Sequence, residues 1–241
     1  MSNNKQPMKN LFFSLQYELL KAGYYSEKTE AMSQISGDLW EVPTKFHSSF
    51  IQVGEVDLSP TVMLNGEAYE DFRYAPLNGL IQLTGAIPEE IESISLTFYK
   101  PRFTVIDAYY KYMVDTQFLR SIVPFFVVGF NTQNFNSFEL GSGLTSETMS
   151  LNIELVASYG DEIEEMKQIL GNLLASTGVR EIDLTEEPLI PDPTLGYAFI
   201  NPNFTYQVIG GWDVSRVPIR NLSFGYGDLN AYRAVTEVFL S

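Results

Sequence analysis

The chain has no cysteine and only one histidine, His47. The absence of cysteine excludes disulfides, thiolate nucleophiles, zinc–cysteine sites and iron–sulfur clusters. A site that needs two or three histidines from one chain is excluded as well. Ser48 and Ser49 follow the histidine, but a catalytic triad requires a geometry and an orienting acid that adjacency in sequence does not supply. We therefore expect no catalytic role for His47.

Basic residues and long apolar runs are also scarce. The sequence contains 15 lysines and arginines and 30 aspartates and glutamates, so the formal net charge is −15. A nucleic-acid binder needs a basic patch to neutralise phosphates, and so does a protein that attaches to an anionic membrane. The longest apolar run, Ile122 to Phe130, contains Pro124 and is far shorter than the ~18 residues of a membrane-spanning helix. The polar first ten residues predict no secretory signal, and we expect no membrane association.

Motifs for a metal, a cofactor or catalysis are lacking too. Gly141-Ser142-Gly143 resembles a fragment of a phosphate loop, but the strand–loop–helix context and a following lysine are missing. Acidic residues form two groups, and neither has the spacing of a calcium-binding loop: Asp161, Glu162, Glu164 and Glu165, and Glu181, Asp183, Glu186, Glu187 and Asp192. We interpret the first group as a helix start. The second is a solvated loop or a loop that pairs with basic residues of a neighbour. We predict no cofactor, no metal ion, no catalytic residue and no enzymatic activity.

What the chain does have is apolar and aromatic residues. Hydrophobic residues make up 45% of its 241 residues, aromatics 14% and charged residues only 19%. This composition excludes a disordered chain and is enough for one large domain or two small ones. A high aromatic content with few charges also suits a protein that buries surface against neighbours.

Two segments predict amphipathic helices. In residues 10–23, Leu11, Leu15 and Leu19 recur at helical spacing, and Gly23 is a natural terminator. Residues 161–177 begin with Asp161 and Glu164, which resemble a capping box. The apolar stripe of this second helix comprises Ile163, Met166, Leu170, Leu173 and Leu174. The polar stretch 24–37 is expected to be irregular, with a short helix around residues 29–35 as an alternative.

Residues 54–100 predict a small antiparallel β module. Asn65-Gly66 and Asn78-Gly79 are strong turn signals, because Asn and Gly tolerate positive φ. Strands are expected at residues 61–64, 69–74 and 80–83. Alternation of Ile94, Leu96 and Phe98 predicts one more strand with a buried face.

The remaining chain is expected to be mostly β. A strand is predicted at 121–130, starting near Pro124, and another at 149–158. The stretch 131–146 is rich in Asn, Ser, Thr and Gly and predicts a long loop. Residues 186–202 contain four prolines and predict an extended loop or arm. The C-terminal region is expected to be β, with a turn at Gly210-Gly211.

Together these patterns predict an α+β fold. A mixed or antiparallel sheet would be packed by the N-terminal and the central helix, with a small β module inserted. The expected boundaries are 1–53 for the N-terminal helix and linker of the main domain, 54–100 for the inserted module, and 101–241 for the rest of the main domain and its C-terminal β region.

Three short passages of the module, Val62–Tyr69, Asn78–Leu83 and Ile94–Tyr99, resemble a β module common in virion proteins of tailed bacteriophages. The passage Ile122–Ser176 is similar to the middle of phage tail-terminator and neck proteins, in the order strand, long loop, strand and amphipathic helix. These likenesses cover about half of the chain, as patterns rather than as identity. The inserted module and the long C-terminal β region depart from the family pattern.

The resemblance implies a ring of six or twelve copies at the head–tail junction of a virion, a particle assembled in the host cytoplasm. Implied partners are other neck, connector and tail tube or sheath proteins. Genomic DNA would pass an acidic lumen without specific binding. The loops 131–144 and 186–202 are the implied contact regions. Their candidate interface residues are Asn131, Asn134, Phe135, Phe138, Glu139, Leu140, Glu186, Glu187, Leu189, Ile190 and Asp192.

Charge distribution is compatible with such contacts. No lysine or arginine occurs from Ser121 to Met166, whereas basic residues occur on both sides of this stretch, as at Arg120 and Arg216. This segregation fits charge complementarity between copies, or an ordinary surface on which the charges fell this way.

Two other functions are open at this point. Trp40, Trp212, the tyrosines and the carboxylates could serve a carbohydrate-binding or glycoside-cleaving protein, although aromatics also pack cores and interfaces. The late β region is compatible with a secreted adhesion or pilus domain. The polar N-terminus and the strong helix at 161–177 argue against the latter.

Overall fold

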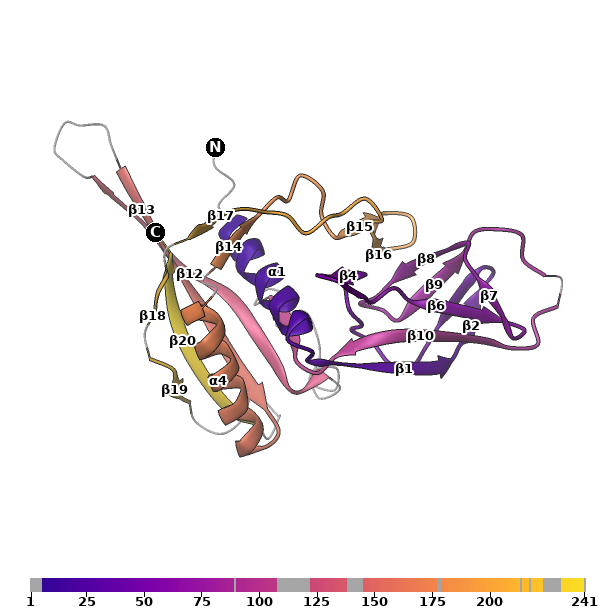
Figure 1. Ribbon diagram of the computed structural model, residues 1–241, viewed down its shortest axis with the longest axis horizontal. Coiled ribbons are helices and arrows are strands. Elements are labelled where there is room, and N and C mark those ends of the chain that lie inside the picture. Colours follow the sequence, from indigo (N-terminus) through magenta and orange to yellow (C-terminus); the bar gives the residue numbers. More distant parts are fainter. Residues whose placement is uncertain are drawn as a thin grey trace. The chain divides into compact units, whose positions relative to one another are not determined.

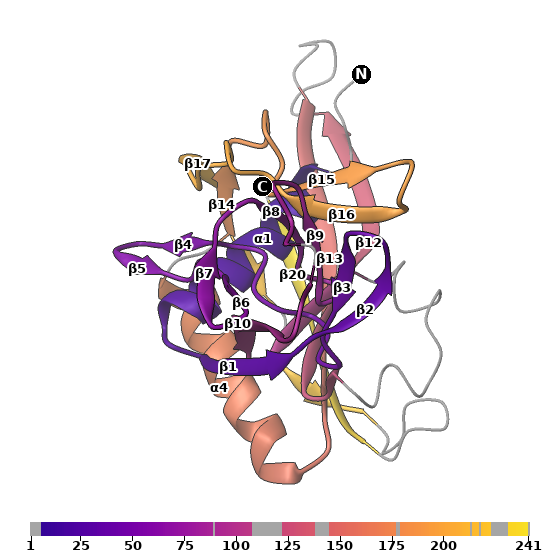
Figure 2. The ribbon, with the colours of Figure 1, turned by 90° about the vertical axis from the view of Figure 1, so that its right-hand side faces the viewer.

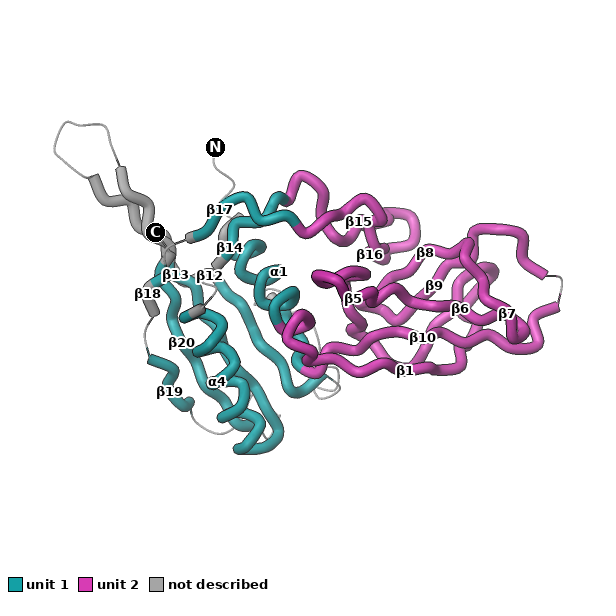
Figure 3. The backbone as a smooth tube through the Cα atoms, in the orientation of Figure 1, with its two compact units in different colours: residues 1–18, 103–183, 207–241 teal, residues 19–102, 184–206 magenta. Residues whose placement is uncertain are grey.

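A computed structural model describes residues 6–88, 90–107, 122–137, 145–176, 179–212, 214–216, 218–222 and 231–240. The chain divides into two compact units (Figure 3). Unit 1 comprises residues 1–18, 103–183 and 207–241, and unit 2 comprises 19–102 and 184–206. Unit 2 is therefore larger than the module expected at 54–100, because it also takes residues 19–53 and the distant segment 184–206.

Helix α1 (Gln6–Lys21) confirms the helix predicted at 10–23. Leu11, Leu15 and Leu19 are all buried. The end of the helix is fixed by Gly23, whose φ of +84° is accessible to a residue without a Cβ. The Gly23 amide donates to the Leu20 carbonyl (2.9 Å), and the Tyr24 amide donates to the Leu19 carbonyl (3.1 Å). These two bonds form a Schellman motif. They satisfy carbonyl groups of the last helical turn that have no hydrogen-bond donor within the helix.

Unit 1 is built around one sheet in the order β11-β12-β13-β20-β18, with β19 also paired to β20. Its strands are β11 (Thr104–Asp107), β12 (Phe125–Ser137), β13 (Thr145–Ala157), β18 (Val214–Arg216), β19 (Arg220–Asn221) and β20 (Tyr232–Leu240). All pairings are antiparallel except that of β11 with β12. Strands β12 and β13 run side by side as a long hairpin (Figure 1 and Figure 2).

The central helix is confirmed as α4 (Gly160–Ser176), which contacts β13 and β20. Its predicted stripe is buried, and so are Leu151, Ile153 and Leu155 of β13. The predicted cap is wrong in detail. Glu162 accepts the bond from the Tyr159 amide (3.2 Å), while Glu164 pairs with Lys167 (2.5 Å). The reason is that the helix begins one residue before Asp161, so its third position falls on Glu162.

The loop predicted at 131–146 is wrong for most of its length. Strand β12 continues to Ser137 and β13 starts at Thr145, with a register shift between Phe130 and Thr132. Cross-strand partners supply the backbone hydrogen bonds here, so polar residues are accommodated in strands that their composition does not predict.

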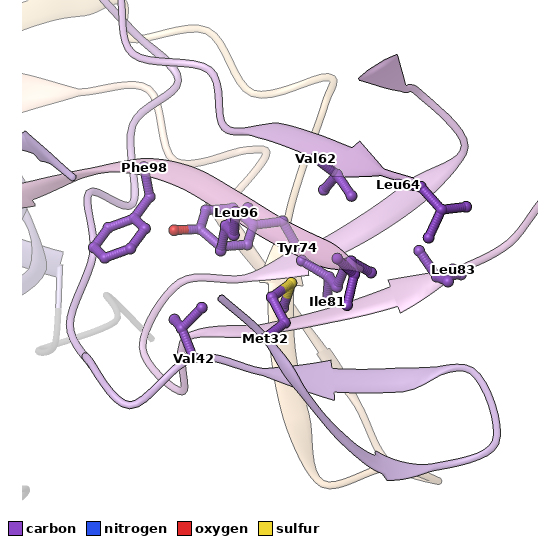
Figure 4. Packing of buried hydrophobic residues seen from close by; sticks show 10 residues of the cluster. Met32, Val42, Val62, Leu64, Tyr74, Ile81, Leu83, Leu96 and Phe98 are labelled. Atoms are coloured by element: carbon purple, nitrogen blue, oxygen red, sulfur yellow. The ribbon is translucent and has the colours of Figure 1, made fainter. Parts of the chain in front are cut away.

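Unit 2 contains two four-stranded antiparallel sheets, in the orders β1-β10-β6-β7 and β2-β3-β9-β8. Their strands are β1 (Tyr25–Ala31), β2 (Ser33–Ser36), β3 (Leu39–Glu41), β6 (Thr61–Leu64), β7 (Glu67–Tyr69), β8 (Phe72–Ala75), β9 (Leu80–Leu83) and β10 (Ile94–Pro101); β4 (Gln52–Val53) and β5 (Val56–Asp57) form a short hairpin. Side chains of both sheets meet in one apolar cluster, which includes Val62, Tyr74, Ile81, Leu96 and Phe98 (Figure 4).

The antiparallel strands and turns of residues 61–100 are confirmed, with one change. Asn65 and Gly66 have φ values of +51° and +86°, as a type I′ hairpin requires. The strand expected at 69–74 is in fact two strands in different sheets, because the chain crosses between the sheets at Glu70 and Asp71.

The irregular or helical structure expected at 24–37 is wrong, because β1 and β2 occupy this stretch. Strand β1 pairs only with β10 among the described strands, and most of its residues are exposed. A polar sequence suits such an edge strand, which needs few apolar side chains and gains from charges that discourage further pairing.

Strands β14 (Val179–Ile182) and β17 (Val208–Trp212) of unit 1 form a two-stranded ribbon. Gly210 and Gly211 lie inside β17, opposite Glu181 and Arg180, so the turn predicted there is wrong. A Cβ added to Gly210 would lie 2.7 Å from Oε2 of Glu181, and glycine here gives the carboxylate room. Across the described helices, none is long and apolar enough to span a membrane.

Two glycines of unit 2 allow a matched test of its packing. Gly79 has a φ of +59°, and a Cβ added to it would lie 2.2 Å from the carbonyl oxygen of Thr44. Gly37 has a φ of +54°, but an added Cβ would meet no atom within 4 Å. Gly37→Ala should cost about 1 kcal/mol of backbone strain. Gly79→Ala should cost at least about 2 kcal/mol more, measured as the change in the free energy of unfolding in urea. Equal losses in the two variants would refute the close packing at Gly79.

Candidate functional site

The proline-rich segment of unit 2 is a hairpin and not the extended arm that its composition predicts. Strand β15 (Leu189–Asp192) pairs with β16 (Tyr197–Ile200), from Leu189 opposite Ile200 to Asp192 opposite Tyr197. Among the described strands β15 has no other partner. An edge strand of this kind tolerates Pro191, because the missing amide leaves no sheet bond unmade on its open side.

Asp192 organises the turn of this hairpin. Its Oδ1 accepts hydrogen bonds from the amides of Thr194 (3.0 Å) and Leu195 (3.2 Å). Gly196, with a φ of +73°, closes the turn by donating to the Asp192 carbonyl (2.8 Å). The second carboxylate oxygen, Oδ2, accepts from Nη1 of Arg73 (2.9 Å). The bond from Arg73, followed by that from the Leu195 amide, holds the pKa of Asp192 below its ordinary value.

Arg73 of β8 contacts the hairpin at two points. Besides Asp192, its Nη1 donates to Oε1 of Gln82 (3.1 Å), and Gln82 in turn donates to Oδ2 of Asp38 (2.8 Å). The guanidinium carbon lies 3.9 Å from the ring centroid of Phe199, within the range of a cation–π interaction. One arginine thus contacts both strands of the hairpin and is held in place from the neighbouring strand β9.

Asn201 fixes the base of the hairpin. It is only 2% exposed, and its Nδ2 donates to Oε2 of Glu186 and to the Glu187 carbonyl, both at 3.0 Å. The Asn201 amide also donates to the Pro188 carbonyl (2.9 Å). Segment 186–201 is therefore a folded part of unit 2.

A pocket of about 410 Å³ opens where this hairpin meets the rest of unit 2. Its walls are mostly apolar and come from three stretches of the chain: Ile51, Ser59 and Pro60; Phe72, Arg73 and Tyr74; and Ile190, Phe199, Ile200 and Pro202. Ser59 and Arg73 are the polar side chains on these walls besides the Tyr74 hydroxyl. A pocket of this volume and character binds an apolar group and can orient it through a few polar contacts.

Among the described residues, the wall of this pocket carries no carboxylate and no histidine. His47 contacts Tyr74, but it is itself 3% exposed and stacks on Phe98 with a centroid distance of 3.6 Å. Its Nε2 lies 3.1 Å from the Thr44 carbonyl, an acceptor, so Nε2 carries the proton. Nδ1 then accepts from the Tyr74 hydroxyl. Both ring nitrogens are satisfied in the neutral form, an arrangement typical of a core residue.

A second candidate surface is the open edge of β17 in unit 1. Among the described strands β17 pairs only with β14. Val208 and Ile209 are 39% and 55% exposed, and the strand contains neither a charged residue nor a proline. Most edge strands are protected by such residues, because an open edge can pair with a strand of another chain.

The structure places the predicted interface residues in three groups. Asn131 lies at the register shift of β12, and Asn134 and Phe135 pair with Thr148 and Glu147 of β13. Phe138, Glu139 and Leu140 lie outside the described residues, as does Gly141-Ser142-Gly143. The remaining five are brought together in the hairpin segment: Glu186, Glu187, Leu189, Ile190 and Asp192. Of these, Ile190 lines the pocket and Asp192 binds the arginine of its wall.

Sequence reasoning missed Arg73, Phe72 and Phe199, and also the open edge at Val208 and Ile209. The only local signal for Arg73 is its position between two aromatic residues in a short strand. Its partner Asp192 is 119 positions away, so no local pattern links the two. Trp40, a candidate for sugar stacking, packs against the apolar cluster of unit 2.

Within the described residues, no three His, Cys, Asp or Glu side chains form a group that could hold a metal ion. Neither a scan against protein-family models nor a search of curated proteins finds a match to this chain.

The contribution of Arg73 to hairpin docking can be measured by hydrogen exchange. Arg73→Ala removes the bond to Asp192 and the contact with Phe199 together, so the amides of β15 and β16 should exchange at least about fivefold faster. Lys45→Ala is the matched control. It removes an ion pair with Glu41 whose side chains are 31% and 46% exposed, and it should leave the hairpin unchanged. Unchanged exchange in Arg73→Ala would show that the arginine does not hold the hairpin.

His47 should make stability depend on pH. Burial is the main cause that lowers its pKa from 6.5 to about 3. Between these two pH values the unfolded chain binds a proton on His47 that the folded chain does not bind. The contribution of His47 to the free energy of unfolding is therefore complete above pH 6.5 and is lost as the pH falls towards 3. The slope is about 1.4 kcal/mol per pH unit within this window. His47→Gln, which can keep both hydrogen bonds and does not titrate, should remove this slope from the urea unfolding free energy. Identical slopes in both proteins would contradict the neutral, buried histidine.

Proposed function

We propose that this chain is a non-enzymatic structural subunit of a tailed-phage virion, which forms a ring at the head–tail junction as a neck or tail-terminator protein. In this role it joins the capsid connector to the tail and lets the genomic DNA pass. Its partners are copies of itself, in a six- or twelve-fold ring, and the neck, connector and tail proteins above and below.

The observation that carries the proposal is the unprotected edge of β17. An edge strand with exposed Val208 and Ile209 and with no charge or proline is a liability in a protein that works alone. The same edge is useful in a subunit whose neighbour covers it on assembly. Pairing of strands across subunits supplies many backbone hydrogen bonds, and the exposed apolar side chains add buried area.

The architecture of unit 1 supports the proposal further. Its order of strand β12, strand β13 and helix α4 agrees with part of the pattern that suggested tail-terminator and neck proteins, although residues 131–137 and 145–146 of the expected long loop belong to the strands. In the proposed plan, α1 and α4 both cover the sheet and leave its other surfaces for contacts with neighbouring subunits. Unit 2 would then be the addition that distinguishes this chain from the common plan.

The charge balance supports passage of DNA without specific binding. The net charge is −15, and several arginines are engaged by acids of the same chain. Arg233 pairs with Glu154 (2.5 Å), Arg73 with Asp192 (2.9 Å) and Arg180 with Glu18 (3.5 Å). Cations that are already paired contribute little to the attraction of phosphates, so DNA in an acidic channel would not be held.

A charge placed on the open edge should prevent assembly. Ile209→Lys puts a cation on an exposed residue of β17, where a neighbour's strand would have to bury it, so the ring should be lost or its assembly concentration raised at least about tenfold. Val56→Lys is the control, because Val56 is similarly exposed at 43% but lies on β5 of unit 2, a strand that already carries the charged residue Asp57. Light scattering over a concentration series, with and without purified tails, measures the mass of each variant. Assembly of Ile209→Lys at the wild-type concentration would rule out the β17 edge as the contact.

A further inference from the structure

The proposed contact through the open edge of β17 in unit 1 gives no role to the pocket of unit 2. This pocket has an apolar interior and one cation on its wall. An occupant suited to it therefore has an exposed apolar side chain with carboxylates close by. The loop 84–93 of the same chain, between β9 and β10, has this chemistry.

Ile87 is the exposed apolar residue of this loop, with 41% of its surface accessible. Pro88 follows Ile87 directly. The exposed carboxylates of Glu90 and Glu92 lie three and five positions after Ile87. Exposed Ile is ordinary when it is isolated, but here it lies in a loop that also carries exposed glutamates and is held at both ends.

The ends of the loop are held by specific hydrogen bonds. At its start, the Thr84 amide donates to the Asp71 carbonyl (2.8 Å) and the Gly85 amide donates to the Tyr69 hydroxyl (3.1 Å). At its end, Oδ1 of Asn65 accepts from the amides of Glu92 (2.8 Å) and Ser93 (3.1 Å). The Asn65 Nδ2 also donates to the Glu90 carbonyl (3.0 Å). Holding both ends of the loop in this way lowers the entropic cost of presenting Ile87 for binding.

We propose that the pocket of one copy receives Ile87 and Pro88 from the loop 84–93 of a second copy. This inference rests on the proposed function, in which copies of the chain assemble. Ile87 does not line the pocket of its own copy, although it is exposed. The contact joins two different surfaces of the chain and is therefore heterologous. Contacts of this type generate closed rings when the rotation between copies closes.

Charge complementarity supports this occupant. Arg73 uses Nη1 for both Asp192 and Gln82, and its guanidinium has further hydrogens on Nε and Nη2 that can bind an incoming carboxylate. Glu90 or Glu92 of the neighbour can supply that carboxylate once Ile87 is inserted. The apolar walls formed by Phe72, Phe199 and Ile190 exclude water around the inserted side chain and strengthen the interaction.

The absence of native cysteine permits a specific cross-linking test with the full chain. Ile87→Cys and Ile190→Cys chains are mixed and oxidised, and the yield of the mixed disulfide is measured on a non-reducing gel. Ile190 lies on the pocket wall and is 45% exposed, so this substitution leaves the core intact. The matched control is Ile35→Cys, 44% exposed and outside the pocket, mixed with the same Ile87→Cys chain.

The pocket pair should give at least about fivefold more mixed disulfide than the control pair, because the contact holds the two thiols within bonding distance. Equal yields overturn the proposal. Light scattering of the same mixtures separates this result from the proposed function. Discrete rings with equal disulfide yields would refute the pocket contact alone. A chain that stays monomeric with every virion partner would refute the proposed ring itself.

Discussion

The bond between Arg73 and Asp192 joins two parts of unit 2 that are 119 positions apart in the sequence. The chain leaves unit 2 after Arg102 and returns only at Leu184, so the hairpin of β15 and β16 must be held by contacts that no local pattern provides. Arg73 supplies some of them by binding Asp192 and covering the ring of Phe199. Phe199 also packs into a buried cluster with Leu39, Ala75 and Leu80. The pocket exists because this hairpin is docked, since Ile190, Phe199 and Ile200 form one of its walls.

Features of this structure that depend on neighbouring residues could be predicted from the sequence. Features that depend on partners far away in the sequence could not. The stripe of α4, the glycine that ends α1 and the Asn65-Gly66 turn each depend on residues within a few positions of one another. Strand β1, by contrast, is polar and is a strand only because β10 pairs with it. The composition of residues 186–202 indicated an extended arm, because prolines are disfavoured in strands and gave no signal for the pairing of β15 with β16. Of the predicted interface residues, Ile190 lines the pocket and Asp192 binds Arg73 of its wall, and a role of either in a contact stays a prediction.

The two candidate surfaces are the basis of the proposed assembly. The only histidine is neutral, buried and bonded at both ring nitrogens, and the described residues of the pocket wall include one cation, Arg73, and a buried tyrosine. In the proposed ring, the open edge of β17 and the pocket of unit 2 would each receive a different element of a neighbour. Two contacts on separate units would fix the rotation between copies more firmly than either contact alone.

The most direct test is a cryo-electron microscopy map of the full chain assembled alone or on purified tails. We expect a closed ring in which the edge of β17 is covered by a neighbouring subunit and in which Ile87 of one copy occupies the pocket beside Arg73 of the next. Isolated monomers under every condition, or a ring that leaves both surfaces exposed to solvent, would contradict the proposed assembly.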